Sequence, residues 1–388
     1  MNFNNLKVAF SDKSNSDLNR AYLLFKSISN PTISRILTSM LKICLWLKIP
    51  ISPIIKATVF KHFCGGTSIK DSQKTIEFLW KSNIGTILDY SAEGKKSEED
   101  FNHVMEETIQ TIYKAKSEKS IPFSVFKFTG LTHFSLLEKI SLELTLSEKE
   151  QEEKKKFTNR VENICKTAAE NNIPIFIDAE ESWIQEAIDQ LTLEMMRKFN
   201  KGGCWIYNTI QMYRKDRINY LNNIIEISIK EKFILGLKIV RGAYHQREIE
   251  RSKEKGYPTP VHLNKVDTDK DYNDALNICI KNSNSISICA GTHNENSSLL
   301  LTKLMKENGF NKNDKRFYFS QLLGMSDHIS YNLSKNGYNV AKYVPYGPVK
   351  EVMPYLIRRA EENTSISGQM GRELSNIIEE KKRRKYEN

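Results

Sequence analysis

A lysine between two aromatic residues is the first candidate for chemistry. Lys127 stands in the segment Phe126-Lys127-Phe128, where strand alternation would turn the lysine into a barrel and both rings toward the surrounding helices. Asp178 ends a later apolar segment, and a buried ammonium group needs an acidic partner of this kind. A purely structural ion pair is the alternative. Buried pairs are seldom net stabilisers, which favours a functional pair.

Two neighbouring arginines form the second candidate. Arg358 and Arg359 follow Tyr355, and helical spacing would place all three on adjacent positions of one face. Two guanidinium groups side by side repel each other unless an anion lies between them, and their forked donors match a carboxylate or a phosphate. Surface pairs with Glu361 and Glu362 explain the spacing equally well. The residues therefore leave an anion site and an exposed salt-bridged face as alternatives.

A histidine in the segment Gly291-Thr292-His293-Asn294 is the third candidate. From its type alone, His293 could be a general base, a metal ligand or a support for a bound cofactor. The other histidines nearby, His245, His262 and His328, provide no HxH or HExxH spacing to join it. We therefore expect no metal site.

These side chains need a scaffold that brings them together, and the sequence indicates one. Eight short apolar or β-branched runs alternate with longer amphipathic segments, the pattern of repeated βα units. The runs cover residues 84–90, 121–131, 173–180, 203–213, 233–244, 285–293, 316–324 and 339–347. They predict an α/β fold, a closed (βα)8 barrel whose strand ends share one mouth. An open doubly wound sheet is the competitor, but the glycine-rich phosphate motifs of its nucleotide-binding forms are missing.

The barrel has flanking segments on both sides. Residues 1–80 read as an N-terminal helical cap, residues 81–365 as the barrel, and residues 366–388 as a basic helical tail. A C-terminal helix is expected over the barrel mouth. Beyond Glu361 the chain becomes polar and then basic, which predicts a helix that runs off the fold into a loose end.

Charge and cysteine content narrow the class of protein. The net charge is +11, but lysines are spread along the chain beside glutamates, which indicates solvated helix surface and no nucleic-acid partner. Six cysteines form no CxxC pair, as expected in a reducing cytoplasm. The apolar residues 43–60 and the basic residues 381–385 suggest the hypothesis of peripheral contact with the inner face of a membrane.

Seven ordered segments together resemble proline dehydrogenase, the flavin enzyme of proline catabolism, in its single-function form. They are FSVFKFTGL, FIDAEES, NTIQMYRKD, LKIVRGAYHQRE, CAGTHNE, QLLGM and KYVPYGPVKEVMPYLIRRAEEN. The resemblance extends over about residues 63–384. It implies a (βα)8 barrel that holds FAD and oxidises L-proline to Δ1-pyrroline-5-carboxylate by hydride transfer from C5 to flavin N5, with a membrane quinone as the final acceptor.

The resemblance also implies roles for individual residues. The carboxylate of proline would be held by Lys127, Arg358 and Arg359, and the ring would be enclosed by Tyr343, Tyr355 and Leu322. Asp178 resembles the motif aspartate that pairs with Lys127, and Lys238 resembles the basic residue near flavin N5. The positions that would contact FAD are Ala179, Gln211, Arg241, Gly242, Ala243, Thr292 and His293.

Two functions of other classes remain to be separated from this one. A cofactor-free barrel lyase could use Lys127 as a Schiff base, and a basic protein could bind RNA through residues 381–385. Only the flavin enzyme would be yellow when purified and lose its colour with proline under anaerobic conditions.

Overall fold

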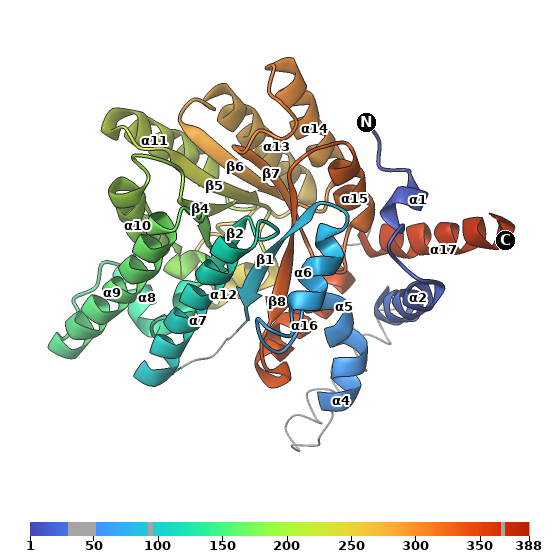
Figure 1. Ribbon diagram of the computed structural model, residues 1–388. Coiled ribbons are helices and arrows are strands. Elements are labelled where there is room, and N and C mark those ends of the chain that lie inside the picture. Colours follow the sequence, from blue (N-terminus) through green and yellow to red (C-terminus); the bar gives the residue numbers. More distant parts are fainter. Residues whose placement is uncertain (30–51, 92–95, 366–368, 388) are drawn as a thin grey trace.

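Eight parallel strands close into a barrel in the computed structural model, as the sequence predicts (Figure 1). The structure describes residues 1–29, 52–91, 96–365 and 369–387. Each strand lies within one of the eight predicted runs, and the strands follow one another around the barrel in chain order. They are β1 (Ile84–Tyr90), β2 (Phe123–Phe126), β3 (Ile175–Ile177), β4 (Ile206–Gln211), β5 (Leu235–Val240), β6 (Ile286–Gly291), β7 (Phe317–Leu322) and β8 (Val340–Tyr346).

Pairing between the first and last strands closes the barrel. β1 and β8 are in register from Ile84 opposite Val340 to Tyr90 opposite Tyr346, while the other side of β1 pairs with β2. An open doubly wound sheet would leave its outer strands with one partner each, so this alternative is excluded. A barrel of eight strands has an interior just wide enough for side chains to fill.

Helices surround the barrel and complete the βα units. They are α6 (Gln73–Trp80), α7 (Glu98–Ser117), η2 (Phe128–Gly130), α8 (Phe134–Ser141), α9 (Glu148–Glu170), α10 (Ser182–Phe199), α11 (Arg217–Glu231), α12 (His245–Lys255), α13 (Lys265–Lys281), α14 (Glu295–Glu307), α15 (Asp327–Lys335) and α16 (Val349–Ser365). Helices α7 and α9 begin with capping boxes, in which Ser97 pairs with Asp100 and Ser147 with Glu150. Such caps satisfy backbone N–H groups that have no partner within a helix.

Strand alternation separates two sets of buried side chains. The barrel interior holds an aromatic-rich cluster that includes Phe123, Val125, Phe176 and Tyr343. Phe126 and Phe128 lie in the larger core between strands and helices, and the Phe128 ring packs edge to face on a ring of α9 at a centroid distance of 5.0 Å. The prediction that these two phenylalanines face the helices, with Lys127 between them facing inward, is confirmed.

The N-terminal and C-terminal segments pack together beside the barrel (Figure 1). The elements there are α1 (Leu6–Ala9), α2 (Asn15–Ser29), α4 (Ser52–Ile55), the π-helical turn η1 (Lys56–Phe60), α5 (Lys61–Phe63) and α17 (Gln369–Glu387). Phe25 of α2 and Ile377 of α17 are buried in one apolar cluster, and Arg384 donates to the backbone oxygen of Phe10 at 2.8 Å.

The expected loose C-terminal end is therefore wrong. The polar composition of this segment conceals a helix face on which Leu374 and Ile377 pack into the apolar cluster that also contains Phe25. Glu380 of the same face is fully buried and binds Arg383 and Arg384 at 2.7 Å. Part of the basic run is thus neutralised within the fold.

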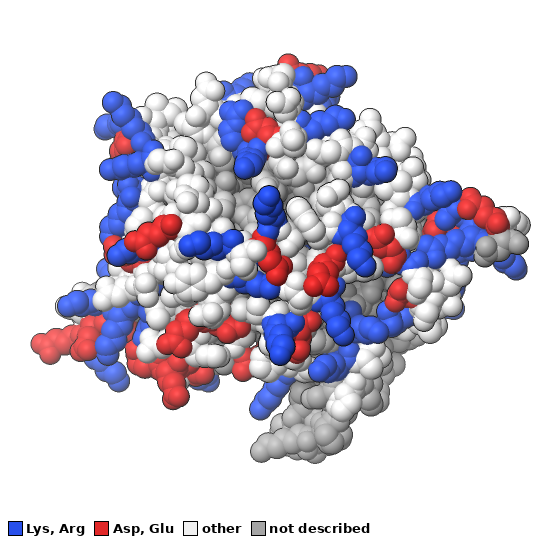
Figure 2. Space-filling view, in the orientation of Figure 1, with Lys and Arg blue, Asp and Glu red and all other residues white. Residues whose placement is uncertain are grey.

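Charged residues of both signs mix on the visible face of the molecule (Figure 2). This distribution agrees with the expectation that most of the positive charge is solvated helix surface. Within the described part of the chain, no helix has both the length and the apolar character needed to cross a membrane. Residues 43–51 of the apolar stretch considered for membrane contact lie outside the described residues.

Candidate active site

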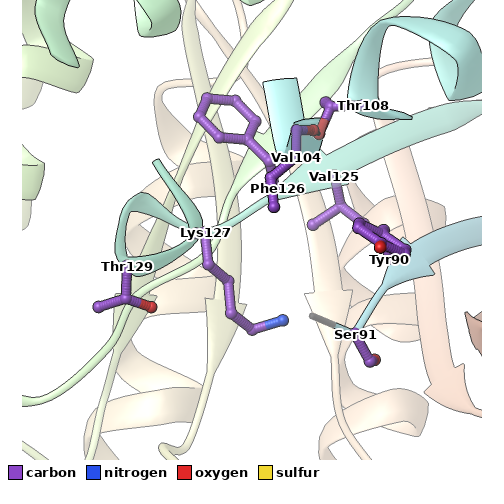
Figure 3. A pocket seen from close by; sticks show the side chains of 9 residues that line it. Tyr90, Ser91, Val104, Thr108, Val125, Phe126, Lys127 and Thr129 are labelled. Atoms are coloured by element: carbon purple, nitrogen blue, oxygen red, sulfur yellow. The ribbon is translucent and has the colours of Figure 1, made fainter. Parts of the chain in front are cut away.

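Lys127 directly follows β2 at the carboxyl end of the barrel, and its amino group points toward the end of β1 (Figure 3). Lys127 Nζ donates to Asp89 Oδ1 and Oδ2 at 3.2 and 3.3 Å. Asp178 Oδ2 lies 3.7 Å from the same nitrogen. The predicted Lys127–Asp178 pair is present, but Asp89 is the carboxylate that accepts the hydrogen bonds. Beside Lys127 lies a cavity of about 20 Å³, enough for about one water molecule.

Lys238 of β5 joins the same cluster from the opposite wall. Its ammonium group donates a short hydrogen bond to Asp178 Oδ1 and a second one, of 2.6 Å, to the hydroxyl of Tyr343. Tyr343 in turn donates to Asp178 Oδ1 at 3.2 Å. Burial, with the Asp178 charge adding to it, raises the pKa of Tyr343 well above its ordinary value. The phenol therefore stays protonated and can serve as a donor. We call Asp89, Lys127, Asp178, Lys238 and Tyr343 the mouth cluster.

Aromatic rings of the barrel interior lie against the ammonium group of Lys238. Lys238 Nζ is 4.5 Å from the ring centroid of Tyr343 and 5.3 Å from that of Phe176. Phe176 stacks on Phe123 at a centroid distance of 4.3 Å. Such rings attract a cation through their negative faces. They also exclude water from the interior side of the mouth cluster, and electrostatic interactions are stronger where water is excluded.

The charges of the mouth cluster balance. Its two lysines and two aspartates have side-chain exposures of 20% for Lys127, 7% for Asp89, 13% for Asp178 and 6% for Lys238. A carboxylate ligand brought to Lys127 would compete with Asp89 and Asp178 for the same ammonium group. Further cations are therefore needed for an anionic ligand to bind well.

Glu180, two residues after Asp178, holds the turn that follows Lys127. Its carboxyl group accepts a hydrogen bond of 3.1 Å from the backbone N–H of Thr129 and a short one from the Thr129 hydroxyl. Burial, followed by the neighbouring charge of Glu181, raises the pKa of Glu180 to about 8. Through its two hydrogen bonds to Thr129, this carboxyl group fixes η2 and, with it, the position from which Lys127 extends.

Arg241 and Gly242 follow β5 and are among the positions that the family resemblance assigns to the cofactor. Arg241 is tied to Asp269 and Thr292 at 2.6 Å each and to Ser297 at 2.9 Å. Gly242 has φ +125°, and a Cβ built on it would lie 2.6 Å from the ring of Tyr213. Both the backbone conformation and the close ring require glycine here. The side chain of Ala243 is exposed next to it.

Two polar residues at the mouth differ in how well they are satisfied. Gln211, the last residue of β4, is 3% exposed, and its Oε1 has no hydrogen-bond partner among the described residues. A buried acceptor in this state costs about 1–3 kcal/mol, which a ligand that donates to it would recover. His293, after β6, lies with Nδ1 2.9 Å from Ser326 Oγ. Ala179 is partly buried directly after Asp178.

Helix α16 brings the second predicted constellation toward the barrel. Tyr355 is 6% exposed and lies in an apolar cluster that Leu322 of β7 also packs against. Leu322 touches the interior cluster of Tyr343 as well, so it connects the two tyrosines that were predicted to enclose a ring. Arg358 is partly buried on α16. The side chain of Arg359, like those of Glu361 and Glu362, lies outside the described part of the structure.

Sequence reasoning missed Asp89 and Ser326. Asp89 stands in the first apolar run, IGTILDY, two residues after the inward-facing Ile87. The same alternation that placed Lys127 inside the barrel could have found it. Ser326 gives no such signal, because its contact with His293 joins segments 33 positions apart. Among the described residues there is no group of three or more His, Cys, Asp or Glu side chains that could hold a metal ion.

The fold and the site first define a class of protein. A closed (βα)8 barrel with an ion cluster at the carboxyl ends of its strands has the architecture of a barrel enzyme. The sequence profile of the family described as proline dehydrogenase matches residues 72–372. The chain belongs to the proline dehydrogenase family, whose named members are oxidoreductases acting on CH–NH donors.

Individual relatives agree with this assignment. The chain is 37% identical over 386 residues to proline dehydrogenase 1, mitochondrial, of Dictyostelium discoideum. This alignment covers 88% of this chain and 68% of that protein. It is 32% identical over 364 residues to the carbapenem antibiotics biosynthesis protein CarD of Pectobacterium carotovorum subsp. carotovorum, which covers 93% of this chain and 94% of that protein.

A solved structure supports the fold. The chain is similar to proline utilization A from Bdellovibrio bacteriovorus, with a TM-score of 0.74 and 18% sequence identity. The similarity covers 95% of this chain but 40% of that longer chain. At this level of identity the comparison supports the barrel architecture.

Proposed function

We propose that this protein oxidises L-proline to Δ1-pyrroline-5-carboxylate with FAD as its cofactor. The observation that carries the proposal is the mouth cluster, in which Lys238 is held by Asp178 and Tyr343 over aromatic rings, within a chain of the proline dehydrogenase family. In the reaction the C5–H bond of proline breaks with loss of a hydride, the nitrogen loses a proton, and a C=N bond forms. The alternative of a lyase with Lys127 as Schiff base is disfavoured, since two carboxylates already bind that ammonium group.

The substrate carboxylate would be bound by Lys127 together with Arg358 and Arg359. The balanced charge of the mouth cluster supports this division, because Lys127 alone already faces Asp89 and Asp178. Arginines extending from α16 would supply the positive charge that the cluster lacks. Their forked donors suit a carboxylate.

The residues at the mouth fit a flavin cofactor on one observation. The buried Oε1 of Gln211 has no partner among the described residues and would accept from an N–H of the flavin. Gly242 would contribute its backbone to the same site, since the ring of Tyr213 fills the position that a side chain would take. We assign Ala179, Arg241, Ala243, Thr292 and His293 to the same binding site.

When bound, FAD supplies the acceptor for a hydride, which no protein side chain can accept. The chain's own residues would hold the substrate and set the charge around it. Lys238 would provide a fixed positive charge beside flavin N5, and Asp178 with Tyr343 would keep its ammonium group in place. Fixing the two reactants in register contributes on the order of 7–11 kcal/mol to barrier lowering when the geometry is near attack.

The colour of the purified protein tests this function directly. We expect a yellow protein whose visible absorbance is bleached when L-proline is added without oxygen, with a product two hydrogens lighter by mass spectrometry. L-Alanine, which has the amine and the carboxylate but no ring, is the control and should cause no bleaching. A colourless protein that takes up no added FAD, or a yellow one that proline leaves unchanged, would contradict the proposal.

Tyr343 would restrict the substrate ring. Its phenol is pinned between Lys238 and Asp178, so it cannot easily turn away from a substituent on C4 of proline. We expect a lower kcat/KM for 4-hydroxyproline than for proline, and a smaller difference in Tyr343→Ser. Equal turnover of the two amino acids by the unaltered enzyme would remove Tyr343 from the ring-binding wall.

We further propose that the electrons pass to a membrane quinone, with the basic C-terminal residues near an anionic lipid surface. Arg383 and Arg384 are engaged by Glu380, and Lys381 lies over the ring of Tyr22. This leaves Lys382 and Lys385, which are exposed, as the cations of the run that are best placed for lipid. Sedimentation with anionic liposomes at low salt tests the contact, and its absence there would reject the membrane part of the proposal.

A further inference from the structure

The backbone of segment 322–326, which joins β7 to α15, forms hydrogen bonds with side chains of other elements. Lys342 of β8 donates to the backbone oxygen of Leu322 at 3.3 Å and, by a short hydrogen bond, to that of Met325. Lys342 is fully buried. A lysine that donates to two carbonyl groups of one short segment fixes the path of that segment relative to the barrel wall.

Two more side chains reach the same segment from outside the barrel. His62 of α5 donates from Nε2 to the backbone oxygen of Gly324 at 2.9 Å. Glu373 of α17 accepts the backbone N–H of Ser326 at 2.6 Å and is 5% exposed. The N-terminal and C-terminal segments of the chain thus meet at one connection of the barrel.

Ser326 carries this restraint to the candidate active site. It has φ 52° and ψ 41°, a left-handed conformation that costs a non-glycine residue free energy and persists only where its surroundings enforce it. Its backbone N–H is bound by Glu373, while its Oγ lies 2.9 Å from His293 Nδ1. One residue therefore connects α17 to the ring of His293.

We propose that Glu373 is a positioning residue of the cofactor site: by holding the backbone of Ser326, it sets the hydroxyl group that orients the imidazole of His293. The inference rests on the proposed function only in assigning His293 to FAD. It makes the C-terminal helix a working part of the site, although Glu373 itself touches no reacting group. The chain of contacts runs from Glu373 Oε1 through Ser326 to His293 Nδ1.

The test compares Glu373→Ala with Glu373→Gln in the full-length chain. Alanine leaves the buried N–H of Ser326 without its acceptor, whereas glutamine keeps an oxygen in place. Glu379→Ala is the matched control, since Glu379 is exposed on the same helix and is bonded to Ser375. Two quantities are measured: the dissociation constant of FAD, by titration of flavin-stripped protein, and the side-chain ¹⁵N signals of His293, which report its tautomer.

We expect Glu373→Ala to weaken FAD binding about tenfold, the effect of roughly one hydrogen bond, and to shift the ¹⁵N signals of His293. Glu373→Gln and Glu379→Ala should stay within about twofold of the unaltered protein, with unchanged signals. If Glu373→Ala leaves both the FAD affinity and the His293 signals unchanged, the proposal is overturned. An equal loss in the alanine and glutamine variants would also overturn it.

A second variant covers the case in which Glu373→Ala does not fold. Ser326→Ala removes the hydroxyl near His293 and keeps the N–H bound to Glu373. It should reproduce both the shift of the His293 signals and the loss of FAD affinity, and unchanged values would reject the positioning role. If no variant and no unaltered protein binds FAD, the proposed function fails, while the His293 signals still show whether Glu373 governs the ring.

Discussion

Two lysines at the barrel wall have different surroundings, and the difference indicates which of them could bind a ligand. Lys342 is completely buried, and its three hydrogen bonds go to Leu322 O, Met325 O and, at 2.9 Å, Asp327 Oδ1. Lys127 keeps a side-chain exposure of 20% and faces carboxylates at the mouth. A saturated ammonium group can only hold structure, whereas a partly open one that is shared between carboxylates can exchange partners with a ligand.

Adjacent residues of β8 supply these two environments. Tyr343 points into the barrel and joins the mouth cluster, while Lys342 points outward to Asp327. Burial acts to raise the pKa of Asp327, but the charges of Lys342 and Lys13 outweigh it and lower that pKa. We call Lys13, Asp327 and Lys342 the cap cluster. The single-residue step along the strand decides which cluster a side chain enters.

The largest expected effect comes from breaking the cap cluster. Lys342→Met should lower the free energy of unfolding by about 3–5 kcal/mol, because it leaves Asp327 buried without its main partner. Urea denaturation measures the loss. The double variant Lys342→Met/Asp327→Leu should recover part of it, since no buried charge is then left unpaired. A single variant as stable as the unaltered protein would show that this pair does not anchor the fold.

Removing a lysine of the mouth cluster should lower turnover more than stability. Lys238→Met should reduce kcat/KM for proline on the order of 10²–10³-fold, the cost of removing one fixed charge from a reaction centre. Its unfolding free energy should fall less than that of Lys342→Met, because Asp178 keeps Lys127 and Tyr343 as partners. Steady-state kinetics and urea denaturation on one preparation check both points. A large stability loss with normal turnover per folded molecule would reverse the comparison.

The arginines of α16 sharpen the assignment of the anion site. Arg358→Met should raise KM for proline about 10- to 100-fold with a smaller change in kcat, the loss of roughly 1.5–3 kcal/mol for a charged hydrogen bond. Lys350→Met, which removes an exposed cation from the same helix, is the control and should leave KM unchanged. An unaltered KM in Arg358→Met would remove Arg358 from the site.

The smallest expected effect is a pH dependence of the unfolding free energy that comes from His62 of α5. Burial lowers the pKa of His62 from 6.5 to about 4, and Lys13 adds to the shift. The unfolded chain binds this proton more readily, so the stability provided by the neutral ring is complete above pH 6.5 and is lost as the pH falls toward 4. Between pH 7 and pH 5 the unaltered protein should lose up to about 2 kcal/mol more than His62→Gln.

Urea denaturation of both proteins at the two pH values measures this difference. Parallel losses in the two proteins would show that His62 is not the group that links the cap to pH. In that case His62 would contribute to the segment that follows β7 through its hydrogen bond to Gly324 and not through its titration.

Part of the site could be predicted from the sequence because it follows from local periodicity. The alternation around Lys127 placed it inside the barrel, and Asp178 was expected near it. The order of the eight runs predicted one shared mouth, which the closed barrel confirms. The boundaries proposed at residues 80 and 365, and the roles of the single site residues, remain predictions.

Other contacts could not be predicted, because they join residues with no common pattern. Nothing in the sequence links Glu373 to Ser326, 47 positions away, or His62 to Gly324, 262 positions away. The C-terminal segment looked loose because its composition is polar, although a narrow apolar stripe was enough to hold it against α2.

The sequence by itself determined the barrel, the family and the residue types at the strand ends, since each of these follows from periodicity or from ordered local motifs. Only the tertiary structure decided which charges meet. It showed that Asp89 accepts the hydrogen bonds of Lys127, that Lys238 shares Asp178 with Tyr343, and that both ends of the chain hold the segment after β7. The physical reason is that an ion pair depends on distances of a few ångströms, which are fixed by packing between elements and not by spacing along the chain.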